Sequence, residues 1–538
     1  MERQYRENVS GKLPLNRKDL PFLLALLAAV YLMGVNVNSD TWFLLNNGRY
    51  VESYGIPHTD PFTFHENLHY VMQQWLFSLL LWKMYSFFGV QSLLVYSHVV
   101  GVAIIFALAG LLWQISHRNR QLVAAIAIPA SLYHSRSYAT QRPWTISFLM
   151  FVLEVFLLEH YREKHPKWLL GTFFVISVFC INIQAAMWPM LMVLLLPYLA
   201  DALFRERCSK SIPCENGWKA REISVLLLVI FLGGFLNPYS WEGMQYGLLT
   251  YGHPSISNFV LEMFPISFKT PNGVLTIVSA VFLTAFYARH PVPLRLLLLA
   301  AGTGLMAFMA GRNITFFVLF GFLGIAWQYR NREFPTCPVP KVAIWILCIM
   351  AVLSLASFHD ILSKTFSASS IKTILFLLPP VLLAILFYRI RWFCYFCVLF
   401  LACSPVFLQL TNREMVPLSL EEPVHVIQQD DANAKVLTNY MDGGYVEFCG
   451  LPCYYDPRGD VFLEEANWEK DFMGEHAELA HGRLHYREFF ATYPEITHVL
   501  TRENELLYTY LPYDSDFELI YDSSEEDVGK IRVFRRKS

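Results

Sequence analysis

Long apolar stretches alternate with short polar segments between residues 20 and 409, and each stretch is long enough to cross a bilayer as a helix. The first stretch follows a basic segment and lacks a small-residue cleavage site, so we interpret it as an uncleaved span. The pattern predicts about 13 spans, over residues 20–37, 91–115, 121–137, 143–159, 168–183, 186–204, 222–236, 273–288, 292–310, 313–329, 342–357, 373–388 and 392–409.

The stretch 72–88 is ambiguous, because it could span the membrane or lie along its surface. Trp75 and Trp82 suit an interfacial helix, since tryptophan favours the headgroup region. Suppose that 72–88 does not span and that the N-terminus is cytoplasmic. The inner segments between the spans then carry 22 Lys and Arg, and the outer segments carry 7. The positive-inside rule favours this arrangement. It predicts an extracytoplasmic C-terminus and two long outer loops, 38–89 and 237–272.

The pattern changes after residue 410. Five short runs are typical of strands, and the region Trp468–Ala480 is typical of a helix. The strand-like runs are AKVLTNY, GGYVEFCG, THVLTREN, FELIYDS and KIRVFRR. We therefore expect a mainly α fold: a transmembrane helix bundle over residues 1–410, followed by a small α/β domain with one sheet over 411–538.

Composition and charge agree with this division. The chain is 55% hydrophobic and only 16% charged, whereas soluble domains average about 25% charged residues. This excludes a soluble enzyme, a disordered regulator and a nucleic-acid-binding protein. Residues 411–538 carry a net charge of −14 and residues 1–410 a net charge of +12, which indicates a membrane body joined to an acidic, water-facing domain.

The ten cysteines add little. Most lie in predicted spans or inner segments, where cysteine usually packs as a small apolar residue. Cys449 and Cys453, within EFCGLPC, lie in the predicted outer domain and could form a disulfide there.

Three outer carboxylates are candidates for chemistry. Asp40 directly follows the first span, where it could accept a proton, help hold a metal, or simply face water. Asp60 stands in TDPF, a sequence that favours a turn, and its structural interpretation comes first. Glu262 lies among apolar neighbours in the second outer loop, and burial there would raise its pKa and make it a possible second carboxylate.

Polar side chains near the outer ends of the spans are candidates for binding. Arginine suits phosphate recognition but also reaches lipid headgroups from a span end. The amides either cap helices or contact sugar hydroxyls, and Trp42 is a further candidate contact for sugar or acceptor. The candidate arginines are Arg136, Arg142 and Arg312, and the candidate amides are Asn182, Gln184 and Asn237.

The segment DTWFLLNNGRYVESYGIPHTDPFTF, followed by QQWLFSLLLW, resembles the first-loop signature of bacterial GT-C glycosyltransferases. That class includes polyprenyl-phosphate-sugar transferases of the mannosyl- and aminoarabinosyl-transferase kind. Further likenesses run through RPW, NIQ, LNPYSW, LEMFP and GRNITFF. The tail segment DGGYVEFCGLPCYYDPRGDVF resembles a region of related membrane proteins that have an external C-terminal domain.

The resemblance implies a transferase that takes a sugar from a lipid-phosphate donor on the non-cytoplasmic face. Asp40 maps onto the first-loop acid that serves as general base or metal-associated acid, and Arg312 and Arg142 onto arginines that hold the lipid phosphate. The Asp-Glu pair of the family is Asp40-Thr41 in this chain, so a second carboxylate would come from Asp60 or Glu262. A divalent cation, Mg²⁺ or Mn²⁺, is a candidate cofactor.

These observations lead to a hypothesis of inverting glycosyl transfer from a polyprenyl-phosphate sugar to a glycan, lipid or protein acceptor. Asp40 would act as the base, and the arginines would neutralise the departing phosphate. A transporter or flippase of a lipid-linked glycan is the alternative, although no internal repeat is evident and the polar residues gather at one face. A non-catalytic envelope scaffold is a third possibility.

Overall fold

The computed structural model describes residues 37–119, most of 122–133, 140–208, 217–250, His253, 261–332, 418–523 and 530–537. The predicted spans 342–357, 373–388 and 392–409 lie outside the described residues, as does 20–37 apart from Val37. Arg136 also lies outside them.

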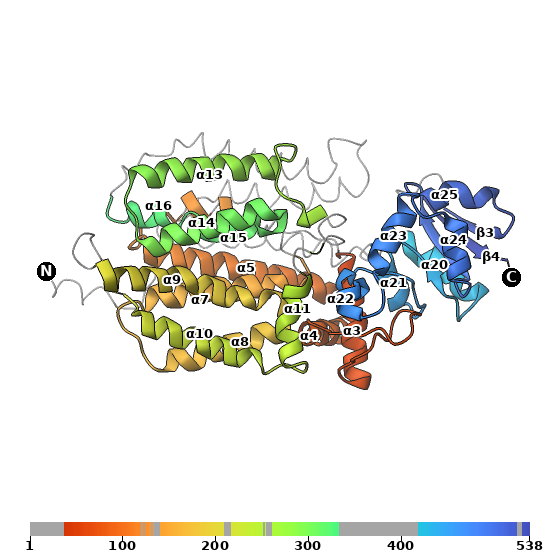
Figure 1. Ribbon diagram of the computed structural model, residues 1–538, viewed down its shortest axis with the longest axis horizontal. Coiled ribbons are helices and arrows are strands. Elements are labelled where there is room, and N and C mark those ends of the chain that lie inside the picture. Colours follow the sequence, from red (N-terminus) through yellow and green to blue (C-terminus); the bar gives the residue numbers. More distant parts are fainter. Residues whose placement is uncertain are drawn as a thin grey trace, which may run out of the picture.

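An elongated bundle of apolar helices forms the larger part of the protein (Figure 1). Three segments, Gln91–Ile115, Ala185–Arg207 and Asn272–Arg289, are long and apolar enough to cross a membrane. The bundle is therefore that of a membrane protein, while the total of about 13 spans stays a prediction. Its main helices are α5 (Gln91–Ile115), α7 (Trp144–His160), α8 (Trp168–Ile183), α9 (Pro189–Cys208), α10 (Ala220–Gly234), α13 (Pro271–Arg289) and α14 (Leu294–Met309).

The predicted span over 313–329 is helical but interrupted by a turn. Helix α15 (Ile314–Phe320) ends at a turn, and α16 (Leu323–Gln328) begins after it. The hydroxyl of Tyr287, on α13, donates a hydrogen bond to the Gly321 carbonyl at 2.9 Å. This side chain takes an acceptor that a continuous helix would use for its own backbone, so tertiary packing decides the break.

The first outer loop contains a helix that the apolar pattern does not reveal. Helix α3 (Asp40–Tyr54) packs on α4 (Trp75–Phe88), which corresponds to the predicted interfacial stretch. Figure 1 shows both at the end of the bundle that faces the C-terminal domain. Gly48 permits their close approach, because a Cβ atom there would lie 2.1 Å from the Ser78 carbonyl oxygen.

We expect Gly48→Ala to destabilise the protein by about 1–3 kcal/mol, because the added methyl group would force the α3 and α4 backbones apart. Gly171→Ala, on the exposed side of α8, is the matched control, since its Cβ would meet nothing within 4 Å. The control should be neutral or stabilising by up to about 1 kcal/mol. Thermal unfolding of both variants in the same detergent checks this, and equal midpoints would contradict the close contact.

The C-terminal domain, called the tail below, is built on one four-stranded sheet in the order β1-β2-β4-β3. Strand β1 pairs with β2 in parallel, and β4 pairs antiparallel with both β2 and β3. The strands are β1 (Val436–Leu437), β2 (His498–Arg502), β3 (Phe517–Asp522) and β4 (Ile531–Arg536). The helices are α20 (Leu418–Asp430), α21 (Gly443–Phe448), α22 (Glu464–Asn467), α23 (Phe472–Ala480), α24 (Tyr486–Thr492) and α25 (Leu506–Tyr510). Helix α11 (Trp241–Thr250) and five 3₁₀ turns complete the described elements. The turns are η2 (Ala185–Met187), η3 (Leu261–Met263) and η4 (Gly311–Asn313) in the bundle part, and η5 (Gly459–Phe462) and η6 (Leu511–Tyr513) in the tail.

One prediction for the tail is wrong, and one predicted helix is present but begins later than expected. The run GGYVEFCG forms helix α21 instead of a fifth strand, because Gly443 and Gly444 pack against backbone atoms of Tyr455 and Phe43. The predicted helix from Trp468 starts only at Phe472, after Asp471 caps it by accepting from the Gly474 amide at 2.8 Å.

The two outer cysteines do not pair, and both are free thiols in the structure. The Cys453 thiol is buried in the tail, where its sulfur lies 3.8 Å from the Gly443 carbonyl oxygen. The possible disulfide is therefore not formed.

The tail packs directly on the first outer loop. Trp42 of α3 is buried between Tyr445 and Phe448 of α21, with ring centroids 5.1 and 5.2 Å away. Farther along the loop, the His65 ring is hydrogen-bonded to the Tyr454 carbonyl at 2.8 Å. These contacts place the tail over the end of the bundle where α5 and α7 begin and α8 and α10 end.

Candidate active site

An ion-paired cluster joins the first outer loop to the start of α7. The Arg142 guanidinium lies 2.6 Å from Oδ2 of Asp40 and 3.5 Å from Oε2 of Glu262. Glu262 lies on a short 3₁₀ turn, η3 (Leu261–Met263), in the second outer loop. The structure thus brings together three predicted site residues from three separate segments.

Neighbouring polar groups fix this cluster in place. Asn38 Oδ1 accepts from the Asp40 backbone amide at 3.0 Å and from Arg142 at 3.3 and 3.4 Å. Gln141 accepts from the Asn38 amide at 3.3 Å and donates to Ser97 of α5 at 3.1 Å. Asp40 and Arg142 are therefore oriented by side chains that sequence reasoning missed, although Gln141 immediately precedes the RPW motif.

Burial changes the proton affinity of both charged partners. Loss of solvent raises the pKa of Asp40, because it outweighs the opposing effect of Arg142, and Glu262 raises it further. Burial disfavours the Arg142 cation, but Asp40 and Glu262 outweigh it and raise the pKa of that guanidinium. Asp40 is therefore a stronger base than an exposed aspartate, beside an arginine that stays charged.

Arg312 lies in the turn between α14 and α15, which contacts the second outer loop. It stands in the 3₁₀ turn η4 (Gly311–Asn313), and the Gly311 amide donates to the Phe264 carbonyl at 2.9 Å. This bond joins η4 to the segment that carries Glu262. Asp40 and Arg312 are consequently at the same end of the bundle.

The tail contributes to the site two residues, Tyr440 and Met441, that the sequence alone did not single out. Met441 lies with its sulfur 3.8 Å from the Ser39 hydroxyl. The half-buried Tyr440 hydroxyl donates to the Pro457 carbonyl at 2.9 Å, and burial, with Asp40 nearby, raises the pKa of Tyr440. Its proximity to Asp40 could be found only from tertiary structure, because the two residues lie in different domains.

The loop that carries Tyr440 and Met441 is braced by charge-assisted bonds. Arg502 donates to both carboxylate oxygens of Asp442, at 2.6 and 2.8 Å. Asn439 donates to Asp442 at 2.9 Å and to Glu505 at 2.6 Å. This bracing connects that loop to strand β2 of the tail.

The predicted sugar-binding amides are mostly engaged within the protein. Asn182 donates to the Val178 and Leu236 carbonyls, both at 2.7 Å, and accepts from Trp75 at 2.8 Å. Asn237 donates to the Gly234 and Ser240 carbonyls at 2.7 and 2.8 Å. The structure therefore favours the capping alternative for both. Gln184 accepts from Ser147 at 3.0 Å, and its amide nitrogen has no partner among the described residues.

Two further predictions need correction, and the structure assigns Asp60 to another cluster. Trp42 is only 4% exposed within the interface with the tail, so its ring offers no face to a sugar. The Glu262 side chain is 36% exposed, so the burial considered for it is not found. Asp60 belongs to a different, buried cluster, because Arg458 of the tail and Thr63 bind its two oxygens.

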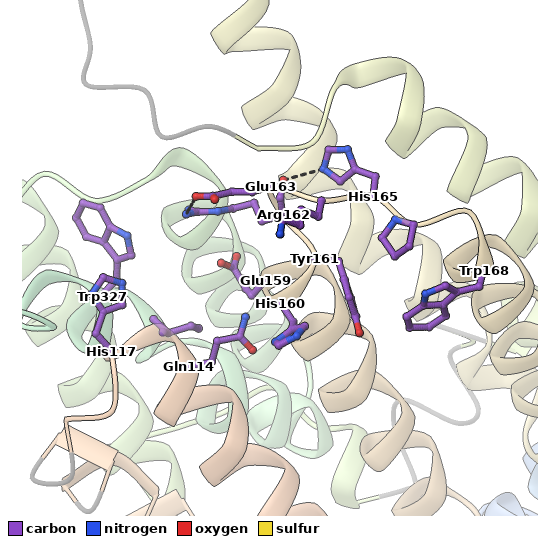
Figure 2. Close-up of a pocket in the computed structure, with 13 residues that line it drawn as sticks. Gln114, His117, Glu159, His160, Tyr161, Arg162, Glu163, His165, Trp168 and Trp327 are labelled. Atoms are coloured by element: carbon purple, nitrogen blue, oxygen red, sulfur yellow. Dashed lines mark hydrogen bonds and ion pairs between the residues drawn. The ribbon is translucent and has the colours of Figure 1, made fainter. Parts of the chain in front are cut away.

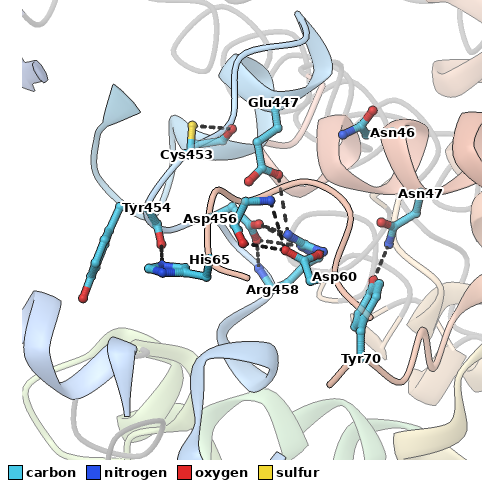
Figure 3. A network of polar contacts seen from close by, with 12 residues as sticks. Asn46, Asn47, Asp60, His65, Tyr70, Glu447, Cys453, Tyr454, Asp456 and Arg458 are labelled. Carbon is cyan, nitrogen blue, oxygen red and sulfur yellow. Dashed lines mark hydrogen bonds and ion pairs between the residues drawn. The ribbon is translucent and has the colours of Figure 1, made fainter. Parts of the chain in front are cut away.

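This second cluster, shown in Figure 3, fastens the tail to the first loop. Arg458 contacts Asp60 and Asp456 directly and lies 3.7 Å from Glu447, with all four side chains at most 2% exposed. Burial disfavours the Asp60 carboxylate, but Arg458 outweighs this and lowers its pKa. Burial, with Asp456 beside it, raises the pKa of Glu447 and favours its neutral form. The cluster is structural, as the first interpretation of Asp60 had it.

The described residues do not fit a divalent cation at Asp40. Both carboxylates of the site direct an oxygen at Arg142, so the guanidinium takes the position between them where a cation would lie. Within the described part of the chain, no group of three or more His, Cys, Asp or Glu side chains could hold a metal ion.

No family model and no curated protein matches the chain, whereas several solved structures are distantly similar to it, two of which are described here. ArnT from Cupriavidus metallidurans, bound to undecaprenyl phosphate, has a TM-score of 0.45 at 10% identity, over 96% of this chain and 97% of that one. The Archaeoglobus fulgidus oligosaccharyltransferase, in complex with zinc and sulfate, has a TM-score of 0.44 at 11% identity, over 89% of this chain and 68% of its own. Since both likenesses are distant, the residues of this chain carry the proposal below.

Proposed function

We propose that the chain is a GT-C-type membrane glycosyltransferase that moves a sugar from a polyprenyl-phosphate-linked donor to a glycan, lipid or protein acceptor. The observation that carries this proposal is the ion-paired cluster of Asp40, Arg142 and Glu262, which lies between the apolar bundle and the tail. The first-loop resemblance supports the same activity. The excess of basic residues in the opposite loops supports a non-cytoplasmic site and an extracytoplasmic tail.

Asp40 serves as the general base of an inverting displacement. Its carboxylate takes the proton of the acceptor hydroxyl while the acceptor oxygen bonds to the anomeric carbon and the bond from that carbon to the phosphate oxygen breaks. The raised pKa of Asp40 strengthens it as a base. Arg142 and Asn38 position this carboxylate.

Arg312, together with Arg142, stabilises the departing polyprenyl phosphate. Negative charge grows on the leaving oxygen in the transition state, so a fixed guanidinium stabilises that state more than the bound donor. Gln184 remains a candidate contact for the sugar through its amide nitrogen. Tyr440 and Met441 face the acceptor side and give the tail a part in acceptor selection.

Transfer by the purified full chain in liposomes tests this function. We expect activity with polyprenyl-phosphate sugars and none with nucleotide sugars. Arg312→Gln should lower kcat/KM for the donor by about 10- to 100-fold, through a higher KM or a lower kcat, because it removes a charge-assisted contact to the phosphate. Lys269→Gln, an exposed cation in the second outer loop, is the matched control and should act like the wild type. Use of nucleotide sugars would contradict the donor class.

The pH dependence of the same reaction tests the role of Asp40. Because its pKa is raised and the base must be deprotonated, the acidic limb of kcat/KM should lie above the ordinary aspartate value of 3.8. Glu262→Gln removes a like charge that raises this pKa, so the limb should move to lower pH. Glu66→Gln, on the exposed surface of the first loop, should leave it in place. If the acidic limb of kcat/KM did not move in Glu262→Gln, the pKa of Asp40 would not be what determines that limb.

A further inference from the structure

A polar cavity lies at the opposite end of the bundle from Asp40. Helix α7 begins beside Arg142 and ends at His160, so its 17 residues separate the two places by about 25 Å. The cavity has a volume of about 760 Å³, within the usual range of ligand sites. It is formed by the end of α5, the α7–α8 loop, the start of α8 and Trp327 of α16 (Figure 2).

A buried ion pair forms the floor of the cavity, and its two charges compensate each other. Glu159 accepts from Arg295 of α14 at 2.8 and 3.2 Å, and from the Tyr198 hydroxyl at 3.1 Å. This carboxylate therefore does not repel an anion in the cavity. The remaining formal charges on the lining are those of Arg162, Lys164 and Glu163, a net of one positive charge.

Two polar side chains on the walls have hydrogen-bonding atoms without partners among the described residues. The imidazole of His160 has no hydrogen-bond partner among the described residues, although it stacks on Phe156 at 5.6 Å. The buried side-chain oxygen of Gln114 also has no partner in the described part of the chain. A half-turn of that amide would present its N–H groups to an anion.

The residues at the rim are typical of the membrane interface. Trp168 is 52% exposed at the start of α8, and Trp327 lines the same cavity. Tryptophan favours the headgroup region of a bilayer, and basic pockets between helix ends suit anionic headgroups. The first turn of α8 adds the positive end of its helix dipole.

We propose that this cavity binds a phosphate monoester or diester, such as the headgroup of an anionic lipid, on the membrane face opposite the candidate active site. Arg162 and Lys164 neutralise the phosphate, while His160 and Gln114 donate hydrogen bonds to its oxygens. The site is independent of sugar transfer, so its test does not require activity.

Binding to the full chain in detergent tests the proposal, with short-chain phosphatidic acid, short-chain phosphatidylcholine and inorganic phosphate as probes in calorimetric titrations. We expect saturable binding of phosphatidic acid, weakened about tenfold or more by Arg162→Gln combined with Lys164→Gln. Binding of inorganic phosphate as well would identify the phosphate group alone as the ligand. Binding of phosphatidic acid alone would identify the lipid headgroup.

Two further variants separate a site from general surface charge. Arg207→Gln combined with Arg221→Gln removes two exposed cations at the same end that do not line the cavity, and binding should be unchanged. Glu163→Gln removes the rim carboxylate, which lies 3.9 Å from Arg162, and should strengthen binding. Equal losses in the two double variants, no gain with Glu163→Gln, or no saturable binding of any phosphate probe would overturn the proposal.

Discussion

Replacing Asp40 with asparagine is expected to lower kcat/KM for sugar transfer by about 10²- to 10⁴-fold, the usual contribution of a general base. The substitution keeps the shape of the side chain and removes its ability to accept the proton. Burial raises the pKa of Asp40 and makes its carboxylate a stronger base than a water-exposed acid. An exposed carboxylate elsewhere in the loop therefore cannot replace it as the base. Initial rates in liposomes with a polyprenyl-phosphate sugar donor measure the effect.

Glu52→Gln is the matched control for Asp40→Asn. Glu52 lies on the same helix, α3, and pairs with Lys83 at the surface instead of facing Arg142. Its loss should leave the rate within about twofold of the wild type, since exposed ion pairs contribute little. Thermal unfolding of both variants shows whether the fold persists. Undiminished transfer by a folded Asp40→Asn variant would remove Asp40 from the mechanism.

Replacing Arg458 with glutamine is expected to destabilise the docked tail by about 3–5 kcal/mol, because it leaves the buried Asp60 and Asp456 carboxylates without their counter-charge. Both carboxylates are bound by this one guanidinium, and Asp60 lies 398 residues away in the sequence. The tail should then separate more easily from the first loop. Limited proteolysis, together with thermal unfolding in detergent, would reveal this as faster cleavage and a lower midpoint.

Arg535→Gln is the control for the loss of a tail arginine. Arg535 pairs with Asp430 and Glu518 on an exposed face, so its removal should change stability by less than about 1 kcal/mol. Adding Asp60→Asn to Arg458→Gln should recover part of the loss, since one uncompensated charge is removed. If Arg458→Gln unfolds no earlier than Arg535→Gln, the buried cluster does not hold the tail in place.

Docking of the tail also bears on transfer. Met441 lies beside Ser39, and Tyr440 near Asp40, only while the tail is seated on α3, because both residues belong to the loop between β1 and α21. A variant that weakens docking of the tail should therefore bind the acceptor less tightly under conditions in which the helix bundle is still folded. The acidic tail is in this respect part of the candidate site and not a separate module.

Several elements could be predicted because their signal is local. The helices α5, α7, α8, α10, α13 and α14 follow apolar stretches closely, since lipid contact requires a continuous apolar surface and internally bonded backbone. Three of the five strand-like tail runs correspond to strands β2, β3 and β4. A fourth contains the short β1.

The failures occur where a distant segment decides the local structure. GGYVEFCG reads as a strand, but the close approach of its glycines to Tyr455 and Phe43 fixes it as a helix. The span 313–329 breaks where Tyr287 takes a carbonyl from its backbone. Trp42 beside Asp40 suggested a sugar contact, yet α21 covers it completely.

The sequence by itself determined that this is an apolar helix bundle with an acidic α/β tail, and it gathered Asp40, Arg142, Glu262 and Arg312 at one face. Alternation of spans fixes which end of a bundle a residue occupies, and that information is local. Only the tertiary structure decided that Arg142 joins Asp40 to Glu262, that Asp60 serves the tail, and that Tyr440 lies near Asp40. Those pairings depend on how the helices rotate and pack and on how the tail docks. Hydrophobic burial is non-directional, so the apolar pattern of a single segment does not determine them.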